Sequence, residues 1–289
     1  MRFLSVLFLA TLLSSCATPP PAPPPAVAPK PALKIALVLG GGAARGFAHI
    51  GVIKALEAQG IVPDMVVGTS AGSVVGALYA SGMKGFDLQR LALEMQEDMV
   101  ADWTLPNRGV LKGEALQEFI NQKARGLPIQ KMPRALGIVA TDLKSGEMVV
   151  FRQGNTGMAV RASSAVPGVF RPVEISGREY VDGGLASPVP VQPARAMGAD
   201  FIIAVDISNV SRRETPTGTL DVLLQTFAIM GHTLSQHELK SADIVIRPKT
   251  AAVSSTSFED RHLAILEGER AAAAVMTELK TKLARASAQ

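Results

Sequence analysis

Cysteine is almost absent from this sequence: the 289 residues include one, Cys16, so an intrachain disulfide is excluded. Aromatic residues contribute only 4% and charged residues 19%, which leaves small and aliphatic side chains to fill the interior, as in closely packed α/β proteins. No block of Lys and Arg is present, and the net charge of +4 is spread along the chain. Because a nucleic-acid-binding surface needs clustered basic residues, we expect no nucleic acid partner.

The N-terminal region has the pattern of an exported and tethered protein. Residues 1–15 hold one basic residue and then an apolar run that is short for a membrane span, which predicts a signal peptide. The Leu-Ser-Ser-Cys sequence that ends at Cys16 resembles a bacterial lipobox, so Cys16 is expected to carry acyl chains that bind a membrane. Residues 16–32 are rich in proline and predict an extended spacer before the folded domain, residues 33–289. Since Ala17 and not Asp follows the cysteine, we expect a lipoprotein of the outer membrane, on its periplasmic side.

Strands and helices alternate in the first part of the folded region. Residues 33–40 form a continuous apolar run that ends in glycines, as expected of a strand buried on both faces of a parallel sheet. Residues 43–60 have helical spacing and stop at Gly60, and a second strand and helix follow over residues 63–82. This order predicts parallel βαβ units in a single α/β domain.

Further elements are expected downstream. Two strands at residues 135–143 and 147–154 predict one hairpin, and residues 173–180 predict another. The remaining predicted elements are buried strands at 199–208 and 242–248 and helices at 87–99, 114–125, 220–239 and 262–284.

A serine lies on a tight corner between a predicted strand and a predicted helix. Ser70 is flanked by Gly68 and Gly72, the Gly-x-Ser-x-Gly pattern of a nucleophile elbow. The start of the following helix favours negative charge beside that serine. The alternative is a turn of small residues that lets helix and strand pack closely, and Ser70 alone does not decide between the two.

A glycine-rich loop follows the first predicted strand. Its successive backbone N–H groups could bind a phosphate or the oxyanion of an acyl-transfer intermediate. A dinucleotide fingerprint counted from Gly40 and Gly42 needs glycine at the position of Arg45, and no Gly-Lys-Ser/Thr follows, so the motif disfavours nucleotide binding.

A third motif is Asp182 followed by Gly183 and Gly184. It places a carboxylate on a loop with few neighbouring side chains. Taken alone, the motif is better explained as an ordinary Asp-Gly turn than as a functional carboxylate.

Together these three motifs resemble the patatin-like phospholipases, and most closely their bacterial lipoprotein branch, which is related to the neuropathy-target-esterase domain. The shared pattern is a glycine-rich block ending in Arg-Gly, then Gly-x-Ser-x-Gly, then Asp-Gly-Gly, with residues 161–173 similar to the block ahead of the aspartate. The resemblance covers about residues 34–208. It implies a three-layer α/β fold with a central, mostly parallel sheet flanked by helices.

The resemblance also implies roles for individual residues. Ser70 would be the nucleophile and Asp182 the general base of a Ser-Asp dyad. The implied oxyanion hole consists of the backbone N–H groups of Gly41, Gly42 and Ala43, with Arg45 steadying that loop. Relatives usually have glycine where this chain has Ala43; if that position needs a positive φ, alanine costs about 1 kcal/mol there. Losing one donor would slow acyl transfer roughly 10²–10³-fold.

The expected function is a membrane-tethered serine hydrolase of phospholipid, lysophospholipid or related acyl esters, with no metal and no cofactor. Three alternatives remain: an acyltransferase or thioesterase on the same dyad, a non-catalytic lipoprotein that binds a lipid or protein partner, and a Ser-Asp-His triad of the α/β-hydrolase type. His232, His237 and His262 follow Asp182 in the order that the triad needs. The serine elbow follows the second strand, however, which is early for that fold. The sequence leaves the oligomeric state open.

Overall fold

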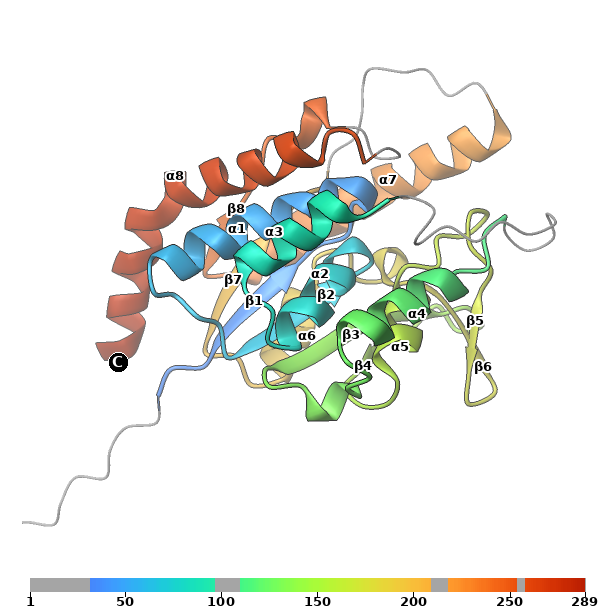
Figure 1. Ribbon diagram of the computed structural model, residues 1–289, viewed down its shortest axis with the longest axis horizontal. Helices are drawn as coiled ribbons and strands as arrows, with labels where there is room; N and C mark the ends of the chain where they lie inside the picture. The colour runs from blue at the N-terminus through green and yellow to red at the C-terminus, as the bar shows by residue number, and fades with distance from the viewer. Residues whose placement is uncertain (1–31, 97–109, 209–217, 254–257, 289) are drawn as a thin grey trace, which may run out of the picture. The chain divides into compact units, whose positions relative to one another are not determined.

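A central sheet organises the domain (Figure 1). The computed structural model describes residues 32–96, 110–208, 218–253 and 258–288, so the predictions for the signal peptide, Cys16 and residues 16–31 of the spacer lie outside the described residues. Within the described ranges, the strands are β1 Ile35–Leu39, β2 Met65–Thr69, β3 Ala135–Asp142, β4 Met148–Phe151, β5 Val173–Ile175, β6 Arg178–Asp182, β7 Phe201–Val205 and β8 Ile244–Ile246. Their order across the sheet is β5-β6-β3-β2-β1-β7-β8, and β4 also pairs with β3.

The sheet is mostly parallel, as predicted. Strands β3, β2, β1, β7 and β8 all run in the same direction. Both predicted hairpins are present, because β4 pairs antiparallel with β3 and β5 pairs antiparallel with β6. Strand β6 also pairs antiparallel with the end of β3, and this pairing positions the site described below.

Helices cover both faces of the sheet. They are α1 Phe47–Ala58, α2 Ala71–Ala80, α3 Gly85–Glu94, α4 Glu114–Lys123, α5 Thr156–Ser163, α6 Val191–Ala196, α7 Thr219–Glu238 and α8 Arg261–Ala288. Alternate residues of β1 belong to different cores: Leu37 and Leu39 pack with α1, α2 and α8, whereas Ala36 and Val38 pack with α6. The predicted three-layer arrangement is therefore confirmed.

Helices α1 and α8 pack unusually closely, and Figure 1 shows them side by side with α3 on one face of the sheet. A side-chain carbon added at Gly268 would lie 2.0 Å from the carbonyl oxygen of Ala48. One added at Gly51 would lie 1.9 Å from the carbonyl oxygen of Ile265. Only glycine permits this approach, which fixes the helix that follows the glycine-rich loop.

Most element boundaries lie near their predicted positions, and Gly60 has the positive φ of 71° expected just after a helix end. Two short helices were not predicted. Helix α5 is capped by Asn155, whose side chain accepts the Met158 N–H at 2.7 Å, and α6 carries Pro193 in its first turn. None of the described helices is long and apolar enough to cross a membrane.

Candidate active site

Ser70 occupies a strained corner between β2 and α2. Its φ of 53° and ψ of −125° are unfavourable for a residue with a side chain. The flanking glycines make the corner possible. A side-chain carbon added at Gly68 would lie 2.4 Å from the Gly72 carbonyl oxygen, and one added at Gly72 would lie 2.0 Å from the Leu39 carbonyl oxygen. The close approach of strand and helix, which is what the alternative of a simple packing turn requires, also holds Ser70 at the corner.

Strand register brings Asp182 to the same point. Strand β3 pairs with β2 up to the Val139–Thr69 pair, and at the next residue it pairs with Asp182 of β6. Asp182 therefore lies beside the end of β2, where Ser70 begins the corner. The Ser70 hydroxyl donates a hydrogen bond of 2.7 Å to Oδ2 of Asp182.

The Asp182 carboxylate is buried and accepts a hydrogen bond through its second oxygen as well. Its Oδ1 accepts the Gly184 N–H at 2.7 Å. Burial raises the pKa of Asp182 to about 6, while the hydrogen bonds from Ser70 and Gly184 act in the opposite direction. A carboxylate with this pKa is ionised at neutral pH yet is a stronger base than an exposed one. Ser70 keeps 9% of its surface exposed and Asp182 only 1%, so a reactant reaches the pair from the serine side.

A second serine, Ser163 at the end of α5, supports the corner. Its hydroxyl accepts the Ser70 N–H at 2.9 Å and donates to the Val139 carbonyl at 2.5 Å. Ser163 falls within the block of residues 161–173 that contributed to the family resemblance, but no role was predicted for it. No local pattern separates it from Ser164 beside it.

The glycine-rich loop runs directly beside Ser70. A side-chain carbon at Gly41 would lie 3.3 Å from the β-carbon of Ser70. Gly41 is one of the predicted oxyanion donors, and its N–H donates to the Pro188 carbonyl at 2.9 Å. Within the described part of the chain, the N–H groups of Gly42 and Ala43 have no acceptor, and neither does that of Ala71, the first residue of α2.

Ala43 and Arg45 shape the end of that loop. Ala43 has a φ of 52°, the left-handed conformation whose cost for alanine is about 1 kcal/mol. Arg45 Nε donates to the Gly42 carbonyl at 3.1 Å. Burial lowers the pKa of Arg45, and the nearby Asp206 carboxylate opposes this effect. Gly42 itself packs against Ile207, whose Cδ1 would lie 2.7 Å from an added side-chain carbon.

Histidine is not part of the pair. His49 is fully buried with Nε2 2.8 Å from the Gly40 carbonyl; because a carbonyl only accepts, Nε2 carries the hydrogen. Burial lowers the pKa of His49 to about 4, so the ring is neutral and supports the loop. His232 Nδ1 lies 3.3 Å from the Ser208 hydroxyl. In the described ranges no histidine bonds to Ser70 or Asp182, and no three His, Cys, Asp or Glu side chains gather as a metal site would need.

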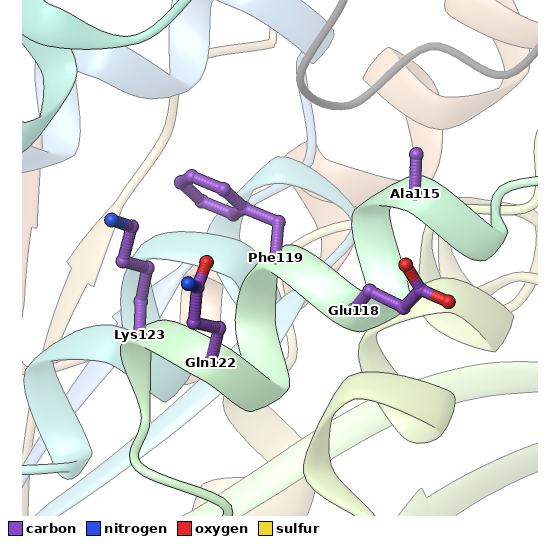
Figure 2. A pocket seen from close by; sticks show the side chains of 5 residues that line it. All are labelled: Ala115, Glu118, Phe119, Gln122 and Lys123. Carbon is purple, nitrogen blue, oxygen red and sulfur yellow. The ribbon is translucent and has the colours of Figure 1, made fainter.

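A surface hollow is formed by other residues. It has a volume of about 520 Å³ and is formed along one face of α4, as Figure 2 shows. Its lining residues are Ala115, Glu118, Phe119, Gln122 and Lys123. Neither Ser70 nor Asp182 contributes to it, so the candidate site is identified by its hydrogen bonds and not by cavity size.

Known proteins resemble this chain in sequence and in fold. The family model "Patatin-like phospholipase" matches residues 37–195. The uncharacterized NTE family protein Rv1063c of Mycobacterium tuberculosis is 37% identical over 177 residues, which cover 61% of this chain and 49% of that protein. Mouse patatin-like phospholipase domain-containing protein 6 is 37% identical over 193 residues, 64% of this chain and 14% of that protein.

Among solved structures, VipD from Legionella pneumophila has a similar fold. The TM-score is 0.58 at 16% sequence identity, and the match covers 86% of this chain and 67% of VipD. The chain spans about half the length of the curated relatives first matched, so the comparison concerns this domain. The matched residues run from the first strand through the serine corner and the Asp182 loop to α6, and on this basis the chain belongs to the patatin-like phospholipase family.

Proposed function

We propose that this protein is a serine lipid acyl hydrolase of the phospholipase or lysophospholipase type. The observation that carries the proposal is the 2.7 Å hydrogen bond from the Ser70 hydroxyl to the buried Asp182 carboxylate. A serine hydroxyl is a weak nucleophile until a base removes its proton, and Asp182 is placed to do so. The raised pKa of Asp182, about 6, suits that task at neutral pH.

The reaction proceeds in two halves. As Ser70 Oγ attacks the ester carbonyl carbon, its proton passes to Asp182 Oδ2. The tetrahedral oxyanion accepts hydrogen bonds from the N–H groups of Gly42 and Ala43, and the start of α2 adds a favourable dipole. The intermediate then collapses, the C–O bond to the alcohol breaks, and the alcohol leaves with the proton from Asp182. In the second half Asp182 takes a proton from water as the water oxygen attacks the acyl carbon. The bond from the acyl carbon to Ser70 Oγ then breaks, Ser70 regains its proton from Asp182, and the fatty acid leaves.

The lipid nature of the substrate is supported by two observations. Phospholipase is part of the name of the mouse relative and of the family model. Helix α7 also exposes large apolar side chains, including Leu223, Ile229 and Met230, which are 49–55% exposed. The same helix places Phe227 against the Asp182 loop, since the Phe227 ring would lie 2.9 Å from a side-chain carbon at Gly184. An apolar surface of this kind suits a lipid substrate.

Membrane tethering forms a separate part of the proposal. The lipobox-like sequence before Cys16 supports lipidation of that cysteine, and the following Ala17 supports an outer-membrane location on the periplasmic side. The test is incorporation of labelled palmitate into the full chain in bacteria, compared with a Cys16→Ser variant. Incorporation should disappear in the variant; equal incorporation would remove the lipidated-anchor proposal.

Labelling with a fluorophosphonate probe tests the catalytic proposal, using the full chain in detergent. Mass spectrometry should locate the adduct on Ser70 and find none in Ser70→Ala. Asp182→Asn should slow labelling by roughly 10²–10⁴-fold, the usual contribution of a general base. Ser81→Ala is the matched control, because Ser81 is also buried and belongs to the residues just after α2, yet bonds only to the Leu78 carbonyl through its hydroxyl.

Labelling of folded wild-type protein at the rate of Ser70→Ala would refute the hydrolase proposal and favour a lipid- or partner-binding role. If Ser70 is labelled, product analysis with a phospholipid separates hydrolysis from acyl transfer. Free fatty acid indicates a hydrolase, whereas an acylated alcohol or thiol product indicates a transferase.

A further inference from the structure

Three successive residues after the Asp182 loop connect the two halves of the candidate site. The Ser187 carbonyl accepts the Thr69 hydroxyl at 2.8 Å, and Thr69 directly precedes Ser70. The Pro188 carbonyl accepts the Gly41 N–H at 2.9 Å, and Gly41 precedes the two open amides of the glycine-rich loop. The segment Ser187–Val189 thus contacts the strand that carries the nucleophile and the loop that carries the oxyanion donors.

One carboxylate holds this segment from the outside. Glu238, the last residue of α7, accepts a short hydrogen bond from the Ser187 hydroxyl and one of 2.9 Å from the Val189 N–H. Ser187 is 1% exposed and Val189 also 1%, so these bonds are shielded from water. Burial raises the pKa of Glu238 to about 7, while the hydrogen bonds from Ser187 and Val189 act against that effect.

We propose that Glu238 is a positioning residue for acyl transfer: its carboxylate fixes Ser187–Val189 and thereby sets the spacing between the Gly42 and Ala43 amides and Ser70 Oγ. Glu238 does not touch the reacting atoms and acts through the segment it holds. The inference rests on the proposed hydrolase function. It adds to the candidate site a residue, Glu238, that lies 56 positions after Asp182 and outside the three sequence motifs.

The expected effect falls on the transition state more than on substrate binding. Misplacing an oxyanion donor or the nucleophile by about 1 Å can cost on the order of 10²-fold in rate. An interaction that is complete only in the transition state lowers kcat and leaves KM nearly unchanged. A residue that only stabilises the fold would instead reduce the amount of active protein and leave kcat per folded molecule unchanged.

The chain offers both a conservative variant and a matched control. In Glu238→Gln the amide oxygen can accept the Val189 N–H while the amide nitrogen donates to the Ser187 hydroxyl, so both contacts survive. Glu238→Ala removes both. Asp243→Ala is the control, because Asp243 likewise accepts a backbone N–H, that of Ile202 at 2.7 Å, at the opposite end of β7 from the site.

The experiment measures kcat and KM for p-nitrophenyl butyrate with full-length protein, each normalised to folded protein by circular dichroism. We expect Glu238→Ala to lower kcat roughly 10–100-fold with KM within about 3-fold of wild type. Glu238→Gln should return kcat to within about 3-fold of wild type, and Asp243→Ala should leave kcat unchanged while lowering the melting temperature. Unchanged kcat in Glu238→Ala, or equal losses in Glu238→Ala and Glu238→Gln, would overturn the positioning role.

Amide hydrogen exchange at Gly41 provides a readout that does not require activity. Because the Gly41 N–H is held by Pro188, Glu238→Ala should accelerate its exchange, whereas Glu238→Gln and Asp243→Ala should not. If wild-type protein hydrolyses no ester, only the proposed function fails. The exchange result still tests whether Glu238 holds the Ser187–Val189 segment against Gly41. Unchanged exchange at Gly41 in Glu238→Ala would refute the inference in either case.

Discussion

Replacing Asp182 by asparagine should make the protein more stable and less active at neutral pH. The carboxylate is 1% exposed, and burial raises its pKa from the ordinary value of 3.8 to about 6. Asparagine preserves both contacts, because its oxygen can accept the Gly184 N–H and its nitrogen can donate to the Ser70 oxygen. The variant therefore removes a buried negative charge without leaving a neighbour unbonded.

The sign of the effect follows from proton binding. Well below pH 3.8 Asp182 is protonated in the folded and in the unfolded chain, so ionisation contributes nothing to the difference. Between about pH 4 and 6 the unfolded chain releases the proton first, so this group lowers the free energy of unfolding as pH rises. A pKa raised from 3.8 to about 6 corresponds to about 3 kcal/mol, all of it expressed above pH 6.

Urea unfolding of wild type and Asp182→Asn at a series of pH values measures this difference directly. The variant should gain up to about 3 kcal/mol at pH 7.5 relative to wild type, compared with the difference at about pH 3. In parallel, the fluorophosphonate labelling rate of wild type should fall as pH drops below about 6, since a protonated Asp182 cannot accept the Ser70 proton. A stability difference that does not change with pH would refute the burial argument, and a labelling rate that is level from pH 5 to 8 would refute the base role.

Three other substitutions test the supporting geometry. Ser163→Ala should destabilise the protein by about 1–3 kcal/mol in urea unfolding and slow labelling, because the Ser70 N–H loses its buried acceptor. Ala43→Gly should change the free energy of unfolding by less than about 1 kcal/mol, because glycine relieves the strained left-handed conformation but also gains freedom in the unfolded chain. The labelling rate of this variant should stay within about 3-fold of wild type. Gly268→Ala should destabilise by about 1–3 kcal/mol or more, measured by thermal or urea unfolding, because its β-carbon would lie 2.0 Å from the Ala48 oxygen.

Each of these tests has a contrary result. Unchanged stability in Ser163→Ala would mean that water or another group replaces the hydroxyl as acceptor. A 100-fold faster labelling rate in Ala43→Gly would mean that alanine displaces an oxyanion donor despite its φ of 52°. A stable Gly268→Ala variant would show that α1 and α8 can separate without cost.

The sequence predicts the parts of the site that are encoded locally. Gly-x-Ser-x-Gly marks the Ser70 corner because both glycines are required by contacts within a few residues or with the adjacent strand. The Asp182 motif is equally local, since its carboxylate accepts an N–H only two residues away. The buried strands could be predicted for the same reason: a continuous apolar run reflects burial on both faces of the sheet.

The supporting contacts could not be predicted because they join residues far apart in the chain. Ser163 accepts a hydrogen bond from the Ser70 N–H, 93 residues away, and Glu238 accepts one from the Ser187 hydroxyl, 51 residues away. The acceptor of the Gly41 N–H is a carbonyl, which every residue carries, so no side-chain pattern marks Pro188. Helix α5 did carry a local signal, because Asn155 is a favoured N-cap residue, but its eight residues are too few for a clear periodic pattern.

The strained and buried features of this site have a common structural cause. Ser70 and Ala43 are two of the four described residues other than glycine with a positive φ, and both lie where acyl transfer is proposed. Such conformations persist only where the surroundings over-determine them. Here the surroundings are the β2–β3–β6 register, the glycine contacts of the corner and the bonds to Ser163 and Ser187. A buried base and a strained nucleophile lower the stability of the fold. The contacts that hold Ser70 and Asp182 in place do not involve the reacting atoms, and they offset this loss. Variants of the holding residues should therefore lose activity and stability together, whereas Asp182→Asn should lose activity and gain stability.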